Sequence, residues 1–361
     1  MTTVETERAV YRARLRGCLL GGAIGDALGN PVEFRSLAEI RQPVGLVANA
    51  EGVAEITDDT QMTLFSLEGF HHGWVRAQAK GIGGAMAQLV HNAYLRWLDT
   101  QEHPAPPPAE GLRHRAGHLR LEPWLYARRA PGSACLSGLR AAYIPDTYAE
   151  PDGRPGPVNP DSKGCGTVMR SAPFGFAGGA RHAYVVAANC ARITHGHPTG
   201  YHAAGAFAAM IAYLLEGESL EAAVLRSMRL LARYPSHEET LGALRRAVDL
   251  ASDGDATPER VESLGGGWVA EEALAIAVYA ALAPVSAPDA HPESTFRARL
   301  RLAVTHSGDS DSTGSICGNL LGACYGDDVL PWEWVSRVEG RATIARLADD
   351  FATESAQTHG Y

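Results

Sequence analysis

The sequence has few cysteines and no C-x-x-C pair among the six it contains. A chain of 361 residues can bury a large core without disulfide staples, so a small disulfide-stapled fold is excluded. We expect reduced thiols, mostly buried.

Long hydrophobic runs are also missing. The longest early apolar stretch, residues 18–28, contains Asp26 and is far shorter than the roughly 20 residues that cross a bilayer. Residues 1–16 carry charges of both signs without the apolar core of a signal peptide. The sequence therefore predicts a cytoplasmic protein without a transmembrane helix.

The chain has fewer basic than acidic residues. The chain has 32 Lys and Arg residues against 41 Asp and Glu residues, which gives a formal net charge of -9 at pH 7. Nucleic-acid backbones and anionic membranes are bound by concentrated positive surfaces. Neither is predicted as a general partner.

Short alternating runs of Val, Ile, Thr and aromatic residues are scarce, so a sheet-based fold has little support. Apolar residues recur instead at helical spacing, notably in residues 201–215, 271–282 and 315–324. No linker, composition shift or repeat divides the chain. We predict one all-α domain over residues 1–361, with a core at about 14–345 and irregular loops at about 101–120 and 146–164.

Four glycines, Gly17, Gly21, Gly25 and Gly29, recur every four residues in the first predicted helix. This spacing lines one helix face with hydrogen atoms and lets another backbone approach closely. A dinucleotide-binding loop is the alternative, but no predicted strand precedes the glycines. The pattern favours close helix packing.

Acidic residues gather in two clusters, Thr-Asp-Asp-Thr at residues 57–60 and Asp-Ser-Asp-Ser-Thr at residues 309–313. Each precedes a predicted helix, so the carboxylates would project from helix N-termini. For either cluster alone, capping is the simpler interpretation. Asp58 with Gln61 has the spacing of a capping box, and Ser312 would cap the helix that follows it.

Together the two clusters hold four carboxylates and several hydroxyls, which is more than two caps need. Packing these groups closely requires positive charge, and a divalent cation supplies it. The donors are hard oxygens with no adjoining His or Cys, which favours Mg²⁺ or Mn²⁺ over Zn²⁺ and Ca²⁺. Residues 309–314 also imitate the start of an EF-hand loop, but Leu320 stands where that loop needs a bidentate Glu.

Several motifs occur in an order that is known from one family. They are Gly25-Asp26-Ala27-Leu28-Gly29 with Glu33, the 57–60 cluster, Gly164-Cys165-Gly166 through Met169-Arg170 to Pro173, and Gly308 to Ser312. Because it has these motifs in this order, the chain resembles the ADP-ribosylglycohydrolase family from about residue 14 to residue 326. The resemblance implies a compact orthogonal helical bundle with two Mg²⁺ or Mn²⁺ ions in a cleft.

The resemblance also implies roles for single residues. The metals would be held by Thr57, Asp58, Asp59, Asp309, Asp311 and Ser312, the last standing where relatives more often have Thr. Asp59 or Asp309 would accept a proton from the attacking water. Glu33 would gate the site or assist catalysis, unless it is a solvated surface residue. ADP-ribose would be contacted by Ser162, Lys163, Gly164, Cys165, Gly166 and His195.

Plainer interpretations of the ligand-contact residues stay open. Residues 161–166 would also form an ordinary glycine turn, and a loop histidine is commonly a hydrogen-bonded polar residue. Cys165 is interpreted as a packing residue, because no neighbouring base or cation marks it as a nucleophile. Trp124 and Tyr126 would either shape the rim of the cleft or pack in the core.

The predicted activity is metal-dependent hydrolysis of the glycosidic bond between ADP-ribose and a protein side chain or other acceptor, with release of ADP-ribose. The partner would be an ADP-ribosylated protein or small molecule, and we expect a monomer. A non-catalytic ADP-ribose-binding or crystallin-like relative and a diphosphate-cleaving metal hydrolase are the alternatives. Arginine, serine and nucleotide linkages stay open, because variable loops contact the leaving group.

Overall fold

The computed structural model describes residues 3–40, 43–81, 83–109, 113–286 and 291–358. Within these ranges the chain forms fourteen α-helices, short 3₁₀ helices and no β-strand, which confirms the all-α prediction. The helices are α1 (Thr3–Gly29), α2 (Asp58–Lys80), α3 (Met86–Glu102), α4 (Ser133–Arg140), α5 (Gly179–Ala191), α6 (Pro198–Leu215), α7 (Leu220–Leu231), α8 (Glu238–Ser252), α9 (Pro258–Glu262), α10 (Ala270–Leu282), α11 (Pro292–Ala303), α12 (Ser310–Tyr325), α13 (Trp332–Val335) and α14 (Arg341–Thr358).

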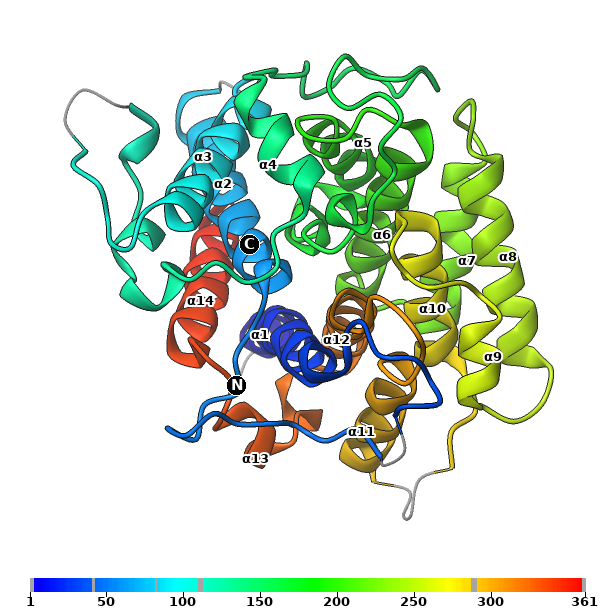
Figure 1. Ribbon diagram of the computed structural model, residues 1–361. Helices are drawn as coiled ribbons and strands as arrows, with labels where there is room; N and C mark the ends of the chain where they lie inside the picture. Colours follow the sequence, from blue (N-terminus) through cyan, green and yellow to red (C-terminus); the bar gives the residue numbers. More distant parts are fainter. Residues whose placement is uncertain (1–2, 41–42, 82, 110–112, 287–290, 359–361) are drawn as a thin grey trace.

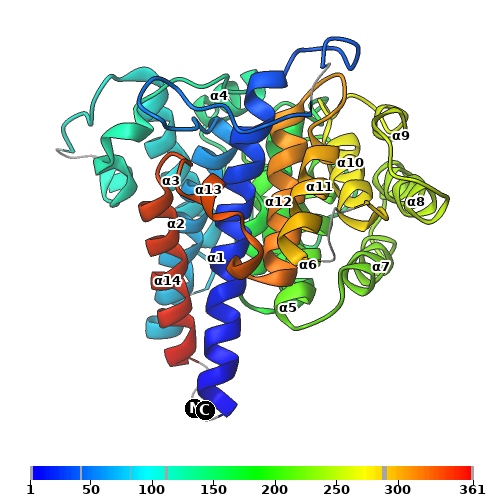
Figure 2. The same cartoon turned by 90° about the horizontal axis from the view of Figure 1, so that it is seen from below.

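Helices α1 and α12 lie side by side near the centre of the molecule (Figures 1 and 2) and run antiparallel. A Cβ atom added to Gly21 would lie 2.5 Å from the carbonyl oxygen of Gly318, and one added to Gly25 would lie 2.0 Å from that of Gly314. These distances are far too short for a side chain, so the two backbones touch. The prediction of close helix packing is confirmed, and the dinucleotide-loop alternative is wrong, because the glycines lie within α1.

The other helices surround this pair. Helix α14 packs on α1 and α2, whereas α6, α10 and α11 pack on α12. Helices α7 and α8 are seen from the side in Figure 1 and along their axes in Figure 2, whereas α1 and α12 are seen along their axes in Figure 1 and from the side in Figure 2. The axes of α7 and α8 therefore run across those of the central pair. Nearly every residue of α6, α10 and α12 is buried. The helices predicted from apolar spacing at residues 201–215, 271–282 and 315–324 lie within α6, α10 and α12, so those predictions are confirmed.

The segments predicted as irregular loops overlap two stretches with little regular structure, apart from residues 101–102, which end α3. No α-helix occurs in the described residues between the end of α3 at Glu102 and the start of α4, or in residues 141–164. All six cysteines are free thiols, and four of them are buried. Among the described helices, none combines the length and the hydropathy needed to cross a bilayer.

Candidate metal centre

The N-terminus of α2 is held by a buried carboxylate from α1. Asp26 accepts hydrogen bonds from the backbone N–H groups of Thr57 and Thr60, both at 3.0 Å, and from the Thr60 hydroxyl. Thr57 is the N-cap, and its side chain accepts a hydrogen bond from the N–H of Asp59 at 3.3 Å. The capping box predicted for Asp58 is therefore wrong. With Thr57 as the cap, both carboxylates of the cluster lie in the first turn of the helix.

The N-terminus of α12 is capped by Asp309, so the prediction of Ser312 as the cap is also wrong. The Asp309 side chain accepts a hydrogen bond from the N–H of Ser312 at 3.4 Å. Its own N–H donates to the carbonyl oxygen of Gly266 at 2.8 Å. Asp311 and Ser312 follow in the first turn and are buried. Both acidic clusters thus stand at helix N-termini, as predicted.

A cavity of about 260 Å³ lies between these two N-termini. The predicted site residues that line it are Glu33, Asp58, Asp59, Ser162, Gly164, Cys165, Gly166, His195, Asp309, Asp311 and Ser312. Thr57 and Lys163 do not line it. The ammonium group of Lys163 forms ion pairs with Glu239, at 2.6 Å, and with Glu271. Two of the three N–H donors of Lys163 are therefore engaged by carboxylates that do not line the cavity.

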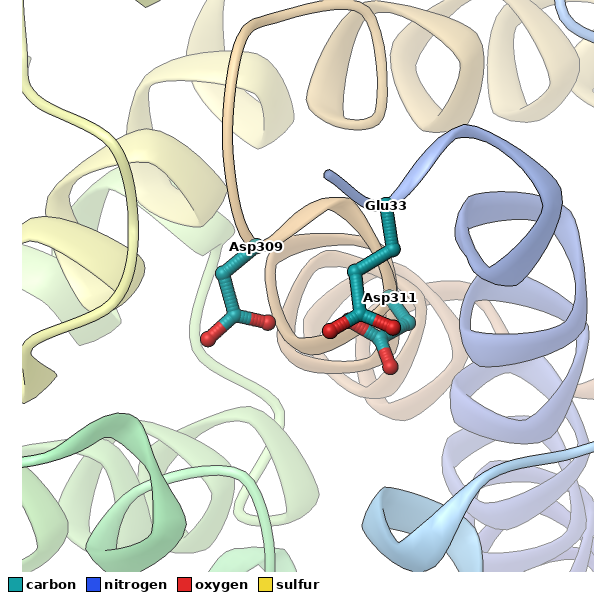
Figure 3. Close-up of side chains that lie close together, drawn as sticks. All are labelled: Glu33, Asp309 and Asp311. Atoms are coloured by element: carbon teal, nitrogen blue, oxygen red, sulfur yellow. The ribbon is translucent and has the colours of Figure 1, made fainter. Parts of the chain in front are cut away.

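Three carboxylates converge at one point of this cavity (Figure 3). Glu33, Asp309 and Asp311 each offer an oxygen atom that lies within 4.8 Å of the others. Glu33 follows the 3₁₀ turn Asn30–Val32 at the end of α1, and the two aspartates come from the start of α12. Glu33 is half-buried and belongs to the lining of the cavity.

Burial raises the pKa values of five carboxyl groups in and around the cavity, because the charged form loses its hydration. The nearby charge of Asp311 is the second cause in every case. The pKa rises to about 7 for Asp26 and to about 8 for Glu33, and lies well above the usual value for Asp58, Asp59 and Asp309. So many crowded carboxyl groups cannot all ionise at neutral pH unless a cation joins them.

The donor set fits a hard divalent cation. Asp59 Oδ1 is buried and accepts no hydrogen bond from the part of the chain that the structure describes. An unpartnered buried carboxylate oxygen is unfavourable, and a cation would satisfy it. Since the cavity offers carboxylate and hydroxyl oxygens, Mg²⁺ and Mn²⁺ suit it best.

Residues 162–166 and His195 form another part of the lining. The N–H of Cys165 donates to the carbonyl oxygen of Trp268 at 3.1 Å, so this amide is already engaged. His195 Nε2 faces the glycines, because a Cβ atom added to Gly164 would lie 3.3 Å from it. Burial, together with the nearby Arg170, lowers the pKa of His195 to about 3. His195 is therefore a neutral hydrogen-bonding group near pH 7.

Two aromatic residues of the cavity were missed in the sequence. Phe34 and Trp268 line the cavity, stack with ring centroids 5.2 Å apart, and remain 71% and 43% exposed. Phe34 has a φ of 64°, which is uncommon for a bulky residue. The only sequence signal near Trp268 is the run of three glycines before it, which predicts a turn but not a cavity. Trp124 and Tyr126, which were considered for the rim, do not line the cavity.

Comparisons with known proteins agree with this geometry. The family model described as ADP-ribosylglycohydrolase matches residues 7–360. The chain is 25% identical over 338 residues to ADP-ribosyl-[dinitrogen reductase] glycohydrolase of Rhodospirillum rubrum, with 90% of each chain covered. It is 24% identical over 361 residues to ADP-ribosylarginine hydrolase Tri1 of Pseudomonas putida, with 98% of this chain and 81% of the relative covered.

ADP-ribosylhydrolase ARH3 of Bos taurus is 29% identical over 358 residues, with 91% of this chain and 89% of the relative covered. A solved structure titled ADP-ribosylglycohydrolase-related protein complex has a TM-score of 0.59 and 26% identity, and the match covers 96% of this chain and 99% of that one. Because the family model spans nearly the whole sequence, this chain belongs to the ADP-ribosylglycohydrolase family.

Proposed function

We propose that the chain is a metal-dependent ADP-ribosylhydrolase. It hydrolyses the glycosidic bond that joins ADP-ribose to a protein side chain or another acceptor and releases ADP-ribose. The observation that carries this proposal is the convergence of carboxylates from the end of α1, the start of α2 and the start of α12 on one cavity. Three relatives with ADP-ribosyl hydrolysis in their names support it.

We infer that two ions, Mg²⁺ or Mn²⁺, are held in this cavity. When bound, they supply positive charge and Lewis acidity toward the substrate. The proposal for their position is supported by the unpartnered Asp59 Oδ1 and by the acidic triad. The proposed ligands that line the cavity are Asp58, Asp59, Asp309, Asp311 and Ser312. Thr57, which does not line it, is the sixth proposed ligand.

Cleavage at a ribose passes through a state with positive charge on the sugar, which water then attacks. The chain must position that water and accept its proton, and we propose Asp59 or Asp309 as the acceptor. Both lie in the cavity wall and both are buried. Glu33 reaches the same point from a separate segment, so it can assist or withdraw without disturbing either helix.

The remaining lining of the cavity suits ADP-ribose. Ser162, the two glycines of residues 164–166 and His195 are proposed to contact its polar groups. The stacked and partly exposed rings of Phe34 and Trp268 are proposed to offer apolar contact to the nucleoside. One relative is named for the arginine linkage, so we propose ADP-ribosylarginine as the first substrate to test.

The decisive test measures products from arginine-, serine- and nucleotide-linked ADP-ribosyl substrates with Mg²⁺, Mn²⁺ or EDTA. Metal-dependent release of free ADP-ribose from one linkage is expected. Release of AMP would identify a diphosphate-cleaving enzyme instead. Calorimetric binding of ADP-ribose without turnover of any linkage would indicate a non-catalytic relative.

Substitutions test which residues carry the reaction. Asp59→Ala and Asp309→Ala should each lower turnover by about a hundredfold or more while the helical content is kept, because each removes a proposed metal ligand. Asp350→Ala, an exposed acidic residue of α14 outside the cavity, is the control and should retain full activity. Full activity in both cavity variants would refute the proposed site.

A further inference from the structure

A buried arginine lies beside the cavity without a carboxylate partner among the described residues. Arg170 is 1% exposed, and its guanidinium lies over the ring of Tyr94, 4.5 Å from the centroid. It donates hydrogen bonds to Thr194 Oγ1 at 2.6 Å and to the sulfur atoms of Cys135 and Met62. Burying a cation without an ion pair is costly. The hydroxyl of Thr194 is the one oxygen acceptor that these contacts provide.

The Thr194 hydroxyl accepts a hydrogen bond from Arg170 and keeps its own proton to donate. Thr194 Oγ1 lies 2.8 Å from His195 Nδ1 and 3.4 Å from the carbonyl oxygen of Ala191. Hydroxyl donors commonly lie about 2.5 to 3.0 Å from their acceptors, so Nδ1 is the better placed acceptor and the bond to Ala191 is the longer and weaker alternative. Nδ1 then accepts a hydrogen bond, and the single proton of a neutral ring must be on Nε2.

The Nε2 atom of His195 faces the glycine segment of the cavity. Cβ atoms added to Gly164 and Gly166 would lie 3.3 and 3.5 Å from it. Burial and the charge of Arg170 keep the ring neutral, as its lowered pKa indicates. The chain of bonds from Arg170 through Thr194 therefore ends in an N–H group beside residues 164–166.

We propose that Arg170 and Thr194 are positioning residues that keep the proton of His195 on Nε2, so that this side of the cavity presents a fixed hydrogen-bond donor to a phosphate or ribose oxygen. The identity of that acceptor rests on the proposed function, whereas the position of the proton does not. A ring protonated at Nε2 cannot also bind a metal through that atom. His195 is thus assigned to the organic ligand and not to the metal centre.

The proton position can be measured directly by NMR. Two-bond ¹H–¹⁵N correlations of the Mg²⁺-loaded protein distinguish the two neutral forms of imidazole, and the His195→Gln variant identifies the His195 signals among the fourteen histidines. The Nε2–H form is expected. An Nδ1–H form or a charged ring at neutral pH would overturn the proposal, whatever the protein does to a substrate.

Two substitutions of Thr194 separate the hydroxyl from packing. Thr194→Val keeps the volume but removes the hydroxyl, so part of the His195 signal should move to the Nδ1–H form. ADP-ribose affinity, measured by calorimetry, should fall roughly tenfold through the loss of a fixed hydrogen bond. Thr194→Ser keeps the hydroxyl and should restore both the NMR signal and the affinity.

The outcomes separate this proposal from that of hydrolysis. An unchanged proton position in Thr194→Val, or equal losses of affinity in the Val and Ser variants, would overturn the positioning role. The expected NMR and binding results, together with no turnover of any linkage, would overturn only the hydrolase activity. Thermal unfolding of each variant, compared with wild type, confirms that the ring is observed in the folded protein.

Discussion

Asp26 acts on the candidate metal centre through the backbone of another helix. It lies in α1, and its carboxylate accepts hydrogen bonds from two N–H groups and one hydroxyl at the start of α2. These bonds determine where the carboxylates of Asp58 and Asp59 lie. Asp26 is therefore a positioning residue, although it does not itself line the cavity.

We predict that Asp26→Asn weakens both the fold and the metal site. An amide nitrogen in the place of Oδ1 would face the N–H group of Thr57, donor against donor, which should cost about 1 to 3 kcal/mol in the free energy of unfolding. Calorimetric titration should also give a weaker Mn²⁺ affinity. The exposed Asp328→Asn is the control and should change neither quantity. Normal Mn²⁺ binding in a destabilised Asp26→Asn protein would contradict the positioning role.

At the scale of elements, the contact between α1 and α12 leaves no room for a side chain at its glycines. A Cβ atom added to Gly318 would lie 2.0 Å from the carbonyl oxygen of Gly21. We expect Gly318→Ala to lower the free energy of unfolding by about 3 kcal/mol, because the two backbones must separate. Urea denaturation measures this loss.

Gly242→Ala in α8 is the matched control for this substitution. Its added Cβ atom would meet only the end of the Arg246 side chain, at 3.8 Å. Because alanine favours helices, this variant should gain up to about 1 kcal/mol. Similar effects of the two substitutions would contradict the close approach of α1 and α12.

An ion-pair cluster joins α14 to α1 and predicts a pH dependence of stability. Asp349 binds Arg12 and Arg16, and the hydrogen bond from Arg12 is the main reason why the pKa of Asp349 falls to about 2. The unfolded pKa is about 3.9, so this stabilisation is complete above roughly pH 4 and disappears as the pH falls toward 2.

Asp349→Asn should therefore lower the free energy of unfolding by about 1 kcal/mol at pH 7, and the difference from wild type should shrink toward pH 3. Urea denaturation at both values measures it. Asp350→Asn replaces the exposed neighbour on the same helix and should match wild type at both. A difference that stays constant with pH would contradict the ion-pair cluster.

At the scale of the whole molecule, the candidate metal centre joins segments that are far apart in the chain. Cations that bind only the folded state stabilise it by about 2.7 kcal/mol when present at about a hundred times their dissociation constant. Mg²⁺ or Mn²⁺ should therefore raise the Tm in scanning calorimetry, and EDTA should reverse the increase. Asp309→Asn should abolish this response. A Tm of the wild-type protein that is insensitive to both ions would exclude a metal centre coupled to the fold.

The sequence by itself determined the local features of this protein. Helical apolar spacing located α6, α10 and α12, and the glycine spacing of α1 predicted its close packing, because both patterns depend on residues within one helix turn or two. The oxygen-only composition of the two acidic clusters also favours Mg²⁺ or Mn²⁺, which stays a prediction. Local composition also placed both clusters at helix N-termini.

Only the tertiary structure decided which side chains face the cavity and which are engaged by other residues. The carboxylates of Asp26 and Glu33 acquire their roles through residues 57–60 and 309–311, and Lys163 is engaged by Glu239 and Glu271. Trp268 reaches the cavity from a loop that carries no sequence motif beyond its glycines. The reason is physical: hydrogen-bond partners, burial and charge depend on contacts between segments that lie tens to hundreds of residues apart, and no local pattern encodes those contacts.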